Sequence, residues 1–362
     1  MPRVRHWTVA AVTTVVVALT LAACSAGAAA PPAATGESAT AESASAGAPV
    51  TLRLGYFPNI THATANVGIE NGIFAEHLPD NVTLEPLSFN AGPAAVEALF
   101  SDGLDATYIG PNPAINAFAQ SNGEAIRIIS GATSGGAFLV VKPEITTAAD
   151  LRGKTLASPQ LGNTQDVALR AWLTEQGHSV PAEGGGEVTI TPQENSQTLE
   201  TFQAGQIDGA WVPEPWATRL IEEGGGHILV DERDLWPDGE YVTTHLVVRT
   251  AFLEEHPDVV KALLEGQVAA NDFVNEDPAE AQRLTNQGIE KVTGKPIGEE
   301  LLSAAWENLT FTNDPIASSL VTSAEHAQEV GLSDPIDLAG IYDLTLLNEV
   351  LAAAGEPAVS EQ

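Results

Sequence analysis

Short loops rich in Ser, Thr, Asn and Gly recur along this chain, each after a β-like apolar run and before a helix-like segment. At that position a loop presents hydroxyl and amide side chains beside the free backbone N–H groups of a first helical turn. The positive end of the helix dipole favours negative charge there. Because these loops contain neither Lys nor Arg, they predict the capture of a small anion by neutral donors.

The candidate ligand-binding residues are the polar and glycine residues of these loops, together with one aromatic side chain. They are Asn59, Thr61, His62, Asn90, Gly92, Asn112, Thr133, Ser134, Gln160, Asn163, Thr164, Asn195, Glu214 and Trp216. Each Ser, Thr or Asn has the alternative role of a plain helix cap. For His62 and Trp216 the alternative is packing in the hydrophobic core, and the sequence leaves both roles open.

Glu214 is the one acid among these candidates, and a carboxylate beside an anion is unfavourable unless a cation lies between them. One interpretation places Glu214 near the start of the helix that follows Pro215, pointing away from the solute. The other gives it an ammonium group to bind, which would make the solute zwitterionic. The loop offers no second acid to enclose a cation, so we favour the first interpretation.

The elements that position these loops alternate in the order expected of an α/β fold. Apolar runs typical of strands cover residues 50–56, 82–89, 104–109, 125–130, 138–141, 154–157, 188–191 and 207–212. The helix-like segments between them predict mainly parallel strands, with the loop at 131–136 after the fourth strand. Ligands of such sheets bind beyond the carboxyl ends of the strands, where the candidate loops lie.

Residues 100–113 and 202–215 resemble each other: both contain Phe, Gly, an apolar-Asp pair, an aromatic residue and Pro-x-Pro. The similarity is either coincidence or a sign of two similarly wound lobes, and the chain from residue 50 onward is longer than one core usually holds. We therefore predict lobe I at 50–140 and 246–362, lobe II at 141–245, and a ligand cleft between them. From Thr250 onward, apolar residues at helical spacing predict a helical C-terminal part.

Residues 1–23 have the pattern of a secretory signal peptide, with Arg3 and Arg5, an apolar segment at 9–21 and small residues before Cys24. The letters LAAC at 21–24 also resemble a bacterial lipobox, in which the peptidase cuts before the cysteine and lipid is attached to its thiol. An ordinary signal peptide with a chance cysteine is the alternative. Residues 24–49 predict a disordered tether, so we expect an exported protein anchored by lipid to the outer face of the cytoplasmic membrane. Cys24 is the only cysteine, which excludes an internal disulfide.

The charge balance limits the partners of the folded part. Lys and Arg number 15 against 48 Asp and Glu, a net charge of −33 at pH 7. Such a chain repels nucleic acid and anionic lipid, so we expect no nucleic-acid partner and no membrane contact beyond the lipid anchor. The acidic surface fits either a high-salt habitat or simple solubility. We further expect a monomer with no cofactor and no metal.

Several motifs, in this order, resemble the ABC-transporter solute-binding proteins for aliphatic sulfonates, whose superfamily also includes nitrate, taurine and thiamine-precursor binders. The motifs are LGYFPN at 54–59 with THA at 61–63, FNAGP at 89–93, GPNP at 110–113, GATSGG at 131–136, DLRGK at 150–154, SPQLGNTQD at 158–166 and VPEPWA at 212–217. The resemblance implies a type II periplasmic-binding-protein fold, in which two lobes joined by two crossing segments close on a solute. It also implies a separate ABC permease and its ATPase as partners.

The resemblance favours a small anionic solute, above all an aliphatic sulfonate, because nitrate and bicarbonate binders would bring a basic residue or a metal to the cleft. Taurine, nitrate or bicarbonate, and a thiamine precursor remain alternatives. Catalysis is not expected. Ser134 lacks the glycine that precedes the serine of a nucleophile elbow by two residues, and the chain contains no His-Glu-x-x-His motif. The fungal thiamine-precursor synthases of the superfamily need a cysteine-rich motif that this chain lacks. A secreted hydrolase or a scaffold lipoprotein is the alternative from another class.

Overall fold

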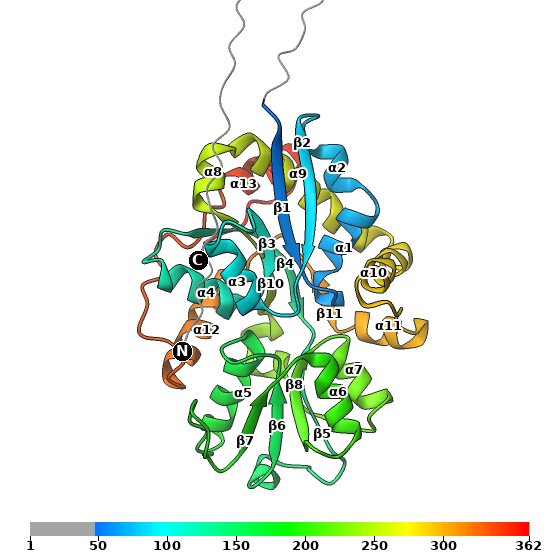
Figure 1. Cartoon of the computed structure of the whole chain (residues 1–362), viewed down its shortest axis with the longest axis vertical. Coiled ribbons are helices and arrows are strands. Elements are labelled where there is room, and N and C mark those ends of the chain that lie inside the picture. The colour runs from blue at the N-terminus through cyan, green and yellow to red at the C-terminus, as the bar shows by residue number, and fades with distance from the viewer. Residues whose placement is uncertain (1–47, 362) are drawn as a thin grey trace, which may run out of the picture. The chain divides into compact units, whose positions relative to one another are not determined.

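The computed structural model describes residues 48–361 (Figure 1). The predicted signal peptide, Cys24 and all but the last two residues of the predicted tether lie outside the described residues. None of the helices between residues 48 and 361 is long and apolar enough to cross a membrane.

The first sheet has six strands in the order β11-β4-β10-β3-β1-β2. Its strands are β1 (Val50–Tyr56), β2 (Val82–Ser88), β3 (Ala106–Ile109), β4 (Ile126–Gly135), β10 (Val242–Arg249) and β11 (Leu309–Phe311). As predicted, β1 runs parallel to β2 and β3, whereas β10 is antiparallel to both β3 and β4. The connections between the first strands carry η1 (Ile60–His62), α1 (Ala63–Glu70), α2 (Ile73–His77), α3 (Gly92–Phe100) and α4 (Pro111–Gln120).

The second sheet has five strands in the order β7-β6-β8-β5-β9. They are β5 (Ala137–Val141), β6 (Thr155–Ser158), β7 (Thr189–Pro192), β8 (Gly209–Pro213) and β9 (His227–Asp231). Here β6 is parallel to β7 and β8, and β5 is antiparallel to β8 and β9. Its helical segments are η2 (Ala148–Leu151), α5 (Thr164–Glu175), α6 (Asn195–Gln203), α7 (Trp216–Glu222), η3 (Glu232–Leu235) and η4 (Pro237–Gly239). We call the elements around the six-stranded sheet lobe I and those around the five-stranded sheet lobe II.

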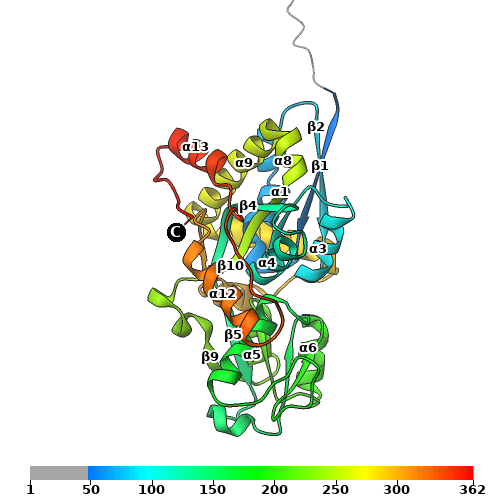
Figure 2. The same cartoon turned by 90° about the vertical axis from the view of Figure 1, so that its left-hand side faces the viewer.

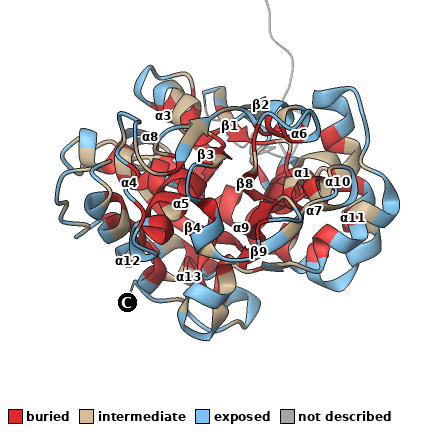
Figure 3. Ribbon diagram, turned by 90° about the horizontal axis from the view of Figure 1, so that it is seen from below, coloured by how far each residue is buried: buried red, intermediate tan, exposed pale blue. Residues whose placement is uncertain are grey.

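The chain after β10 is helical apart from β11, and it belongs to lobe I. It forms α8 (Thr250–Glu255), α9 (Pro257–Glu276), α10 (Pro278–Thr293), α11 (Glu299–Trp306), α12 (Ala317–Glu329) and α13 (Thr345–Ala354). Val260 and Leu264 of α9 are buried in the same hydrophobic cluster as Leu52 and Leu54 of β1. Figure 2 shows α8, α9 and α13 grouped beside the sheet of lobe I, and α13 packs against α9. In Figure 3 buried residues gather near the centre of the view, and exposed residues lie on the outer helices and loops.

The predicted loop at 131–136 is instead the end of a strand. β4 continues through Thr133 and Ser134 to Gly135, because it pairs with β10 on one side and with β11 on the other. The chain then enters lobe II through Gly135 and Gly136, at φ of +78° and +73°. These left-handed conformations favour glycine, and a Cβ built on Gly135 would lie 2.8 Å from the carbonyl oxygen of Asn308. The chain returns to lobe I between β9 and β10.

Candidate functional site

A small cavity lies between the two lobes, at the ends of the strands that the candidate loops follow. Lobe I lines it with Phe57, Thr61, His62, Asn90, Ala91, Gly110, Thr243 and Thr244, and lobe II with Pro159, Asn163, Thr164, Gln165, Asn195 and Pro213. Its volume of about 30 Å³ has room for little more than a water molecule. The lobes are therefore closed against each other in this structure.

Helices from both lobes begin at the cavity. In lobe I these are η1 leading into α1, then α3 and α4, and in lobe II they are α5 and α6. None of their N-cap residues makes a side-chain cap hydrogen bond, although Asn59 and Asn163 carry amides that are able to do so. The backbone N–H groups in the first turns of these helices therefore have no side-chain caps, and they lie around the same cavity. Such an arrangement attracts an anion.

Three polar atoms of the lining have no hydrogen-bond partner within residues 48–361. They are the hydroxyls of Thr164 and Thr244 and the amide oxygen of Asn195. All three residues are buried. Because buried polar atoms in folded proteins are nearly always paired, the two hydroxyls are donors that a bound anion would satisfy, whereas the Asn195 oxygen accepts and needs a donor.

His62 faces the cavity as a neutral ring. The backbone N–H of Phe57 donates to its Nδ1 at 3.3 Å, so the proton of the neutral imidazole lies on Nε2. Burial lowers the pKa of His62 to about 3. A second buried histidine, His245, does not line the cavity; its Nε2 donates to the carbonyl of Pro315, and burial lowers its pKa to about 4. The described residues that line the cavity therefore include no charged side chain at neutral pH.

Six of the predicted residues line the cavity, and others form hydrogen bonds with the loops that carry the lining. Those that line it are Thr61, His62, Asn90, Asn163, Thr164 and Asn195. The Thr133 hydroxyl donates to the carbonyl of Thr61 at 2.7 Å, so it fixes the first loop. Asn59 accepts a hydrogen bond from Trp216 Nε1 at 3.0 Å, a contact between the lobes.

The remaining predicted residues lie outside the lining. The Asn112 amide donates to the carbonyl of Ser323 at 3.0 Å, and Ser134 lines a separate pocket near the chain crossing. Gln160 lies in the turn before α5, where its carbonyl accepts from the N–H of Asn163. Gly92 has a packing role, because a Cβ there would collide with Pro113 and lie 3.2 Å from Asn163 Oδ1.

Glu214 is buried outside the cavity lining, where its carboxylate bonds to Thr218 of lobe II and to Asn308 of lobe I. Its Oε1 accepts from the Thr218 hydroxyl at 2.9 Å and from Asn308 Nδ2 at 2.7 Å, and its Oε2 accepts from the Thr218 N–H at 3.1 Å. Burial raises the pKa of Glu214 to about 7, against the opposing effect of these hydrogen bonds. Glu214 does not line the cavity, which agrees with the interpretation that it points away from the solute.

The profile of the NMT1-like family matches residues 45–287, more than half of the chain. The chain belongs to the NMT1-like family. One relative, the taurine-binding periplasmic protein of Escherichia coli strain K12, is 25% identical over 280 residues, which cover 74% of this chain and 83% of that protein.

Solved structures of similar proteins share the fold at low sequence identity. The alkanesulfonate-binding protein SsuA from Xanthomonas axonopodis pv. citri has a TM-score of 0.65 at 18% identity and covers 84% of this chain and 99% of that one. The periplasmic nitrate-binding protein NrtA from Synechocystis PCC 6803 has a TM-score of 0.69 at 16% identity, covering 85% of this chain and 90% of that one. The predicted two-lobed periplasmic-binding-protein fold is confirmed.

Sequence reasoning missed part of the cavity of this family member. Thr243 and Thr244 come from β10, a strand that reads as a core element, and only a Thr pair beside His245 marks it as polar. Gly110 belongs to the GPNP motif but has no side chain to suggest a role. A Cβ on Gly110 would collide with Thr164 Oγ1, so this glycine allows the two lobes to approach closely.

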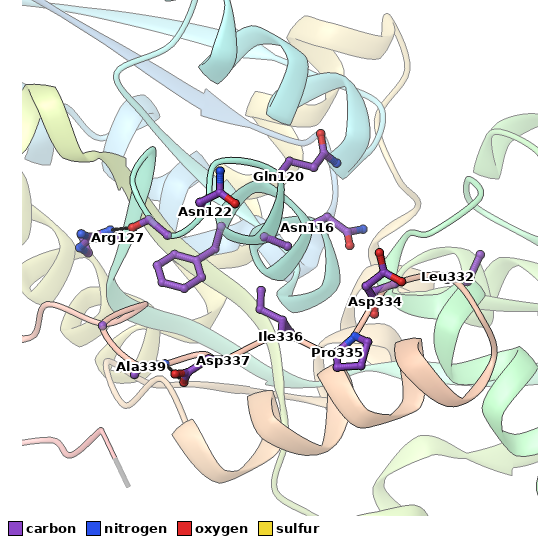
Figure 4. A pocket seen from close by; sticks show the side chains of 15 residues that line it. Asn116, Gln120, Asn122, Arg127, Leu332, Asp334, Pro335, Ile336, Asp337 and Ala339 are labelled. Carbon is purple, nitrogen blue, oxygen red and sulfur yellow. Dashed lines mark hydrogen bonds between the residues drawn. The ribbon is translucent and has the colours of Figure 1, made fainter.

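A larger pocket elsewhere shows that volume alone does not locate the site. It has about 740 Å³ and lies on lobe I between the end of α4 and the segment 332–340 (Figure 4). Its lining includes Arg127, whose guanidinium donates to the carbonyls of Gly123 and Ile126, and the acids Asp334 and Asp337. The pocket lies at the C-terminal end of α4, so it lacks the convergent helix starts of the inter-lobe cavity.

Proposed function

We propose that the protein is the solute-binding component of an ABC importer and that it captures an aliphatic sulfonate without chemical turnover. The inter-lobe cavity carries the proposal, because uncapped helix starts from both lobes meet there with the unpaired hydroxyls of Thr164 and Thr244. A sulfonate stays ionised at neutral pH and offers three acceptor oxygens. Backbone N–H groups, hydroxyls and the Nε2–H of His62 are suitable donors for them.

The apolar part of the lining supports an organic solute over an inorganic ion. Phe57, Ala91, Pro159 and Pro213 place carbon atoms on the cavity wall, where a short alkyl tail would pack. The E. coli relative is named for taurine and the Xanthomonas structure for alkanesulfonate. The ammonium group of taurine would need a carboxylate, and the nearby Glu214 already bonds to Thr218 and Asn308. We therefore infer that an unsubstituted alkanesulfonate is preferred.

Capture requires the lobes to separate first. A cavity of about 30 Å³ is smaller than any alkanesulfonate, so the solute enters an open form and closure then surrounds it. Gly135 and Gly136 form one of the two crossings, and because glycine has no Cβ its backbone reaches many conformations, so we infer that the chain bends there.

Transport requires an ABC permease and its ATPase, which take the solute from this protein. We place the protein outside the cytoplasmic membrane as a monomer, attached only through lipid on Cys24. Replacing Cys24 by Ser should leave a product that partitions into the aqueous phase of a detergent extraction. Unchanged lipid labelling of that variant would contradict the anchor.

A thermal-shift panel tests the solute. It compares ethanesulfonate and butanesulfonate with taurine, nitrate, bicarbonate, sulfate and a thiamine-precursor pyrimidine, and mass spectrometry checks that the solute is unchanged. A solute at 100 times its dissociation constant should add about 2.7 kcal/mol to the free energy of unfolding. A shift with nitrate or bicarbonate and none with the sulfonates would overturn the proposal, and a chemically changed solute would indicate an enzyme.

A further inference from the structure

Two polar residues, one from each lobe, flank the place where the chain crosses between the lobes. The N–H of Glu214, at the end of β8 in lobe II, donates to the carbonyl of Gly136 at 2.8 Å. Asn308, in lobe I just before β11, packs its carbonyl against Gly135. Any opening of the lobes about these glycines therefore moves Glu214 and Asn308 relative to each other.

The side chains of these two residues are bonded to each other across the lobes. Asn308 Nδ2 donates to Glu214 Oε1 at 2.7 Å, and Glu214 is only 1% exposed. By contrast, the bond from Asn90 to Glu194, which also joins the lobes, is exposed to solvent. A hydrogen bond to a buried carboxylate is worth more than one that water competes for. Without Asn308, the Glu214 carboxylate would keep only the hydroxyl and the N–H of Thr218 as donors, both within lobe II.

We propose that Asn308 and Glu214 form a latch whose hydrogen bond sets the fraction of the solute-free protein that is closed. Both are positioning residues, since neither lines the cavity. Solute binds tightly only when both walls of the cavity are in place, so the apparent affinity rises in proportion to the fraction of the protein that is closed.

The charged groups around Glu214 are engaged elsewhere, so the latch depends on its neutral donors. On α7, Arg219 pairs with Glu223, and beyond the crossing Arg233 pairs with Asp231. Glu307, next to Asn308, lines a separate pocket with Arg233. Burial already raises the pKa of Glu214 to about 7, so a second negative charge placed at Asn308 would act strongly on it.

The test measures opening directly in the absence of solute, so its result is independent of the proposed function. Spin labels are attached at Glu97→Cys on α3 and Glu200→Cys on α6, both exposed, in the full chain carrying Cys24→Ser. Electron-electron resonance gives the distance distribution between the lobes. The chain with the native latch should show a closed population at pH 8.

Asn308→Asp should lower the closed-to-open ratio at pH 8 by tenfold or more, and by less at pH 5, where one of the two acids is protonated. Adding Glu214→Gln to Asn308→Asp should restore the ratio to within about threefold, because the Gln amide then donates to the new carboxylate. Asn308→Ala, which adds no charge, should lower the ratio about threefold to tenfold. An unchanged distribution in Asn308→Asp at pH 8, or failure of the double variant to restore closure, would overturn the latch.

Glu232→Gln is the matched control. Glu232 is also a buried acid of lobe II with its pKa raised to about 7, but it accepts from Trp211 Nε1 within the same lobe. Its replacement should change the melting temperature and leave the distance distribution as it was. If Glu232→Gln opens the lobes as much as Asn308→Asp does, the effect is general destabilisation and the latch is wrong.

Discussion

The two walls of the cavity differ in how their polar groups are used. On the lobe I wall, the Thr61 carbonyl accepts from Thr133 and the His62 Nδ1 accepts from the N–H of Phe57. On the lobe II wall, the Thr164 hydroxyl and the Asn195 amide oxygen have no partner in the described chain. The difference indicates that lobe I presents a fixed half-site, while lobe II carries a hydroxyl that a bound anion would complete and an amide oxygen that needs a donor.

The stiffness of the lobe I wall has a structural cause. Behind η1 and β3, Thr64 donates to Asn271 at 2.5 Å and the Tyr108 hydroxyl donates to Gln267, and both acceptors lie on α9. Helix α9 thus ties the first loop to the core of lobe I. Thr244 is the exception on this side, since its hydroxyl lacks a partner although β10 is held on both edges.

The largest effect is expected where the two walls touch. Gly110→Ala would place a methyl group against Thr164 Oγ1, so the lobes would close incompletely. We expect a loss of alkanesulfonate affinity of at least about 100-fold by calorimetry, equivalent to about 2.7 kcal/mol. Gly298→Ala is the control, because its Cβ would meet nothing within 4 Å. Near-normal affinity of Gly110→Ala would mean that the walls do not meet in the bound form.

The interiors of the two lobes should respond to pH in opposite directions. In lobe II, burial raises the pKa of Glu232 from 4.5 to about 7, so the stability linked to it is complete below about pH 4.5 and is lost as the pH rises to 7. In lobe I, His62 and His245 have lowered pKa values, so their contribution is present above about pH 6.5 and is lost on acidification.

Titration of Glu232 should lower the free energy of unfolding of the native protein by about 2 kcal/mol as the pH rises from 5.5 to 7.5. The Glu232→Gln variant should lack this decrease. Gln keeps an oxygen that accepts from Trp211, so packing is preserved. Urea unfolding of both proteins at several pH values measures the difference. If the free energy of unfolding depended on pH in the same way in both proteins, Glu232 would titrate normally in the folded protein.

The unpaired and paired hydroxyls of the two walls permit a direct comparison. Thr164→Val removes an unpartnered hydroxyl, and it should weaken alkanesulfonate binding about tenfold with little change in melting temperature. Thr133→Val breaks the bond to Thr61 and should cost about 1 kcal/mol of stability. Calorimetry and thermal unfolding of both variants separate the two effects. If Thr164→Val lost affinity and stability to the same extent, the Thr164 hydroxyl would stabilise the fold and would not bind the solute.

The loops of the site were predictable because they follow a general rule of α/β chains. Asn90, Asn163 and Asn195 each come after an apolar run and before a helix, and the ends of parallel strands bring such positions together. The fold followed from the same alternation. Residues from the antiparallel strand β10 do not obey that rule, which is why Thr244 was missed.

Long-range pairing explains the other misses. The sequence at 131–136 is typical of a loop, and only pairing with β10 and β11, more than 100 residues later, makes it a strand. The role of Asn308 depends on a bond to Glu214, and nothing near Asn308 in the sequence indicates it. The position of a loop can be read from the neighbouring sequence, whereas a hydrogen bond between the lobes depends on how the two lobes close on each other.

The smallest expected effect is the pH dependence of binding to the lobe I wall. We expect alkanesulfonate affinity to change less than about twofold between pH 6 and 8 when it is measured in the Glu214→Gln variant, which removes the titration of the latch. The donors that remain are backbone N–H groups, hydroxyls, amides and the neutral ring of His62, and none of them titrates in that interval.

A bound anion favours imidazolium, so the argument depends on how far the pKa of His62 would have to move. Raising it from about 3 to above 6 would require about 4 kcal/mol of extra interaction with the charged ring. The second proton would also displace the N–H of Phe57 from Nδ1, which would lose a hydrogen bond that shapes the first loop. Calorimetric titration at several pH values decides the matter. A tenfold fall in affinity toward pH 8 would show that His62 binds the solute as a cation, and the lobe I wall would then be a charged site rather than a fixed neutral one.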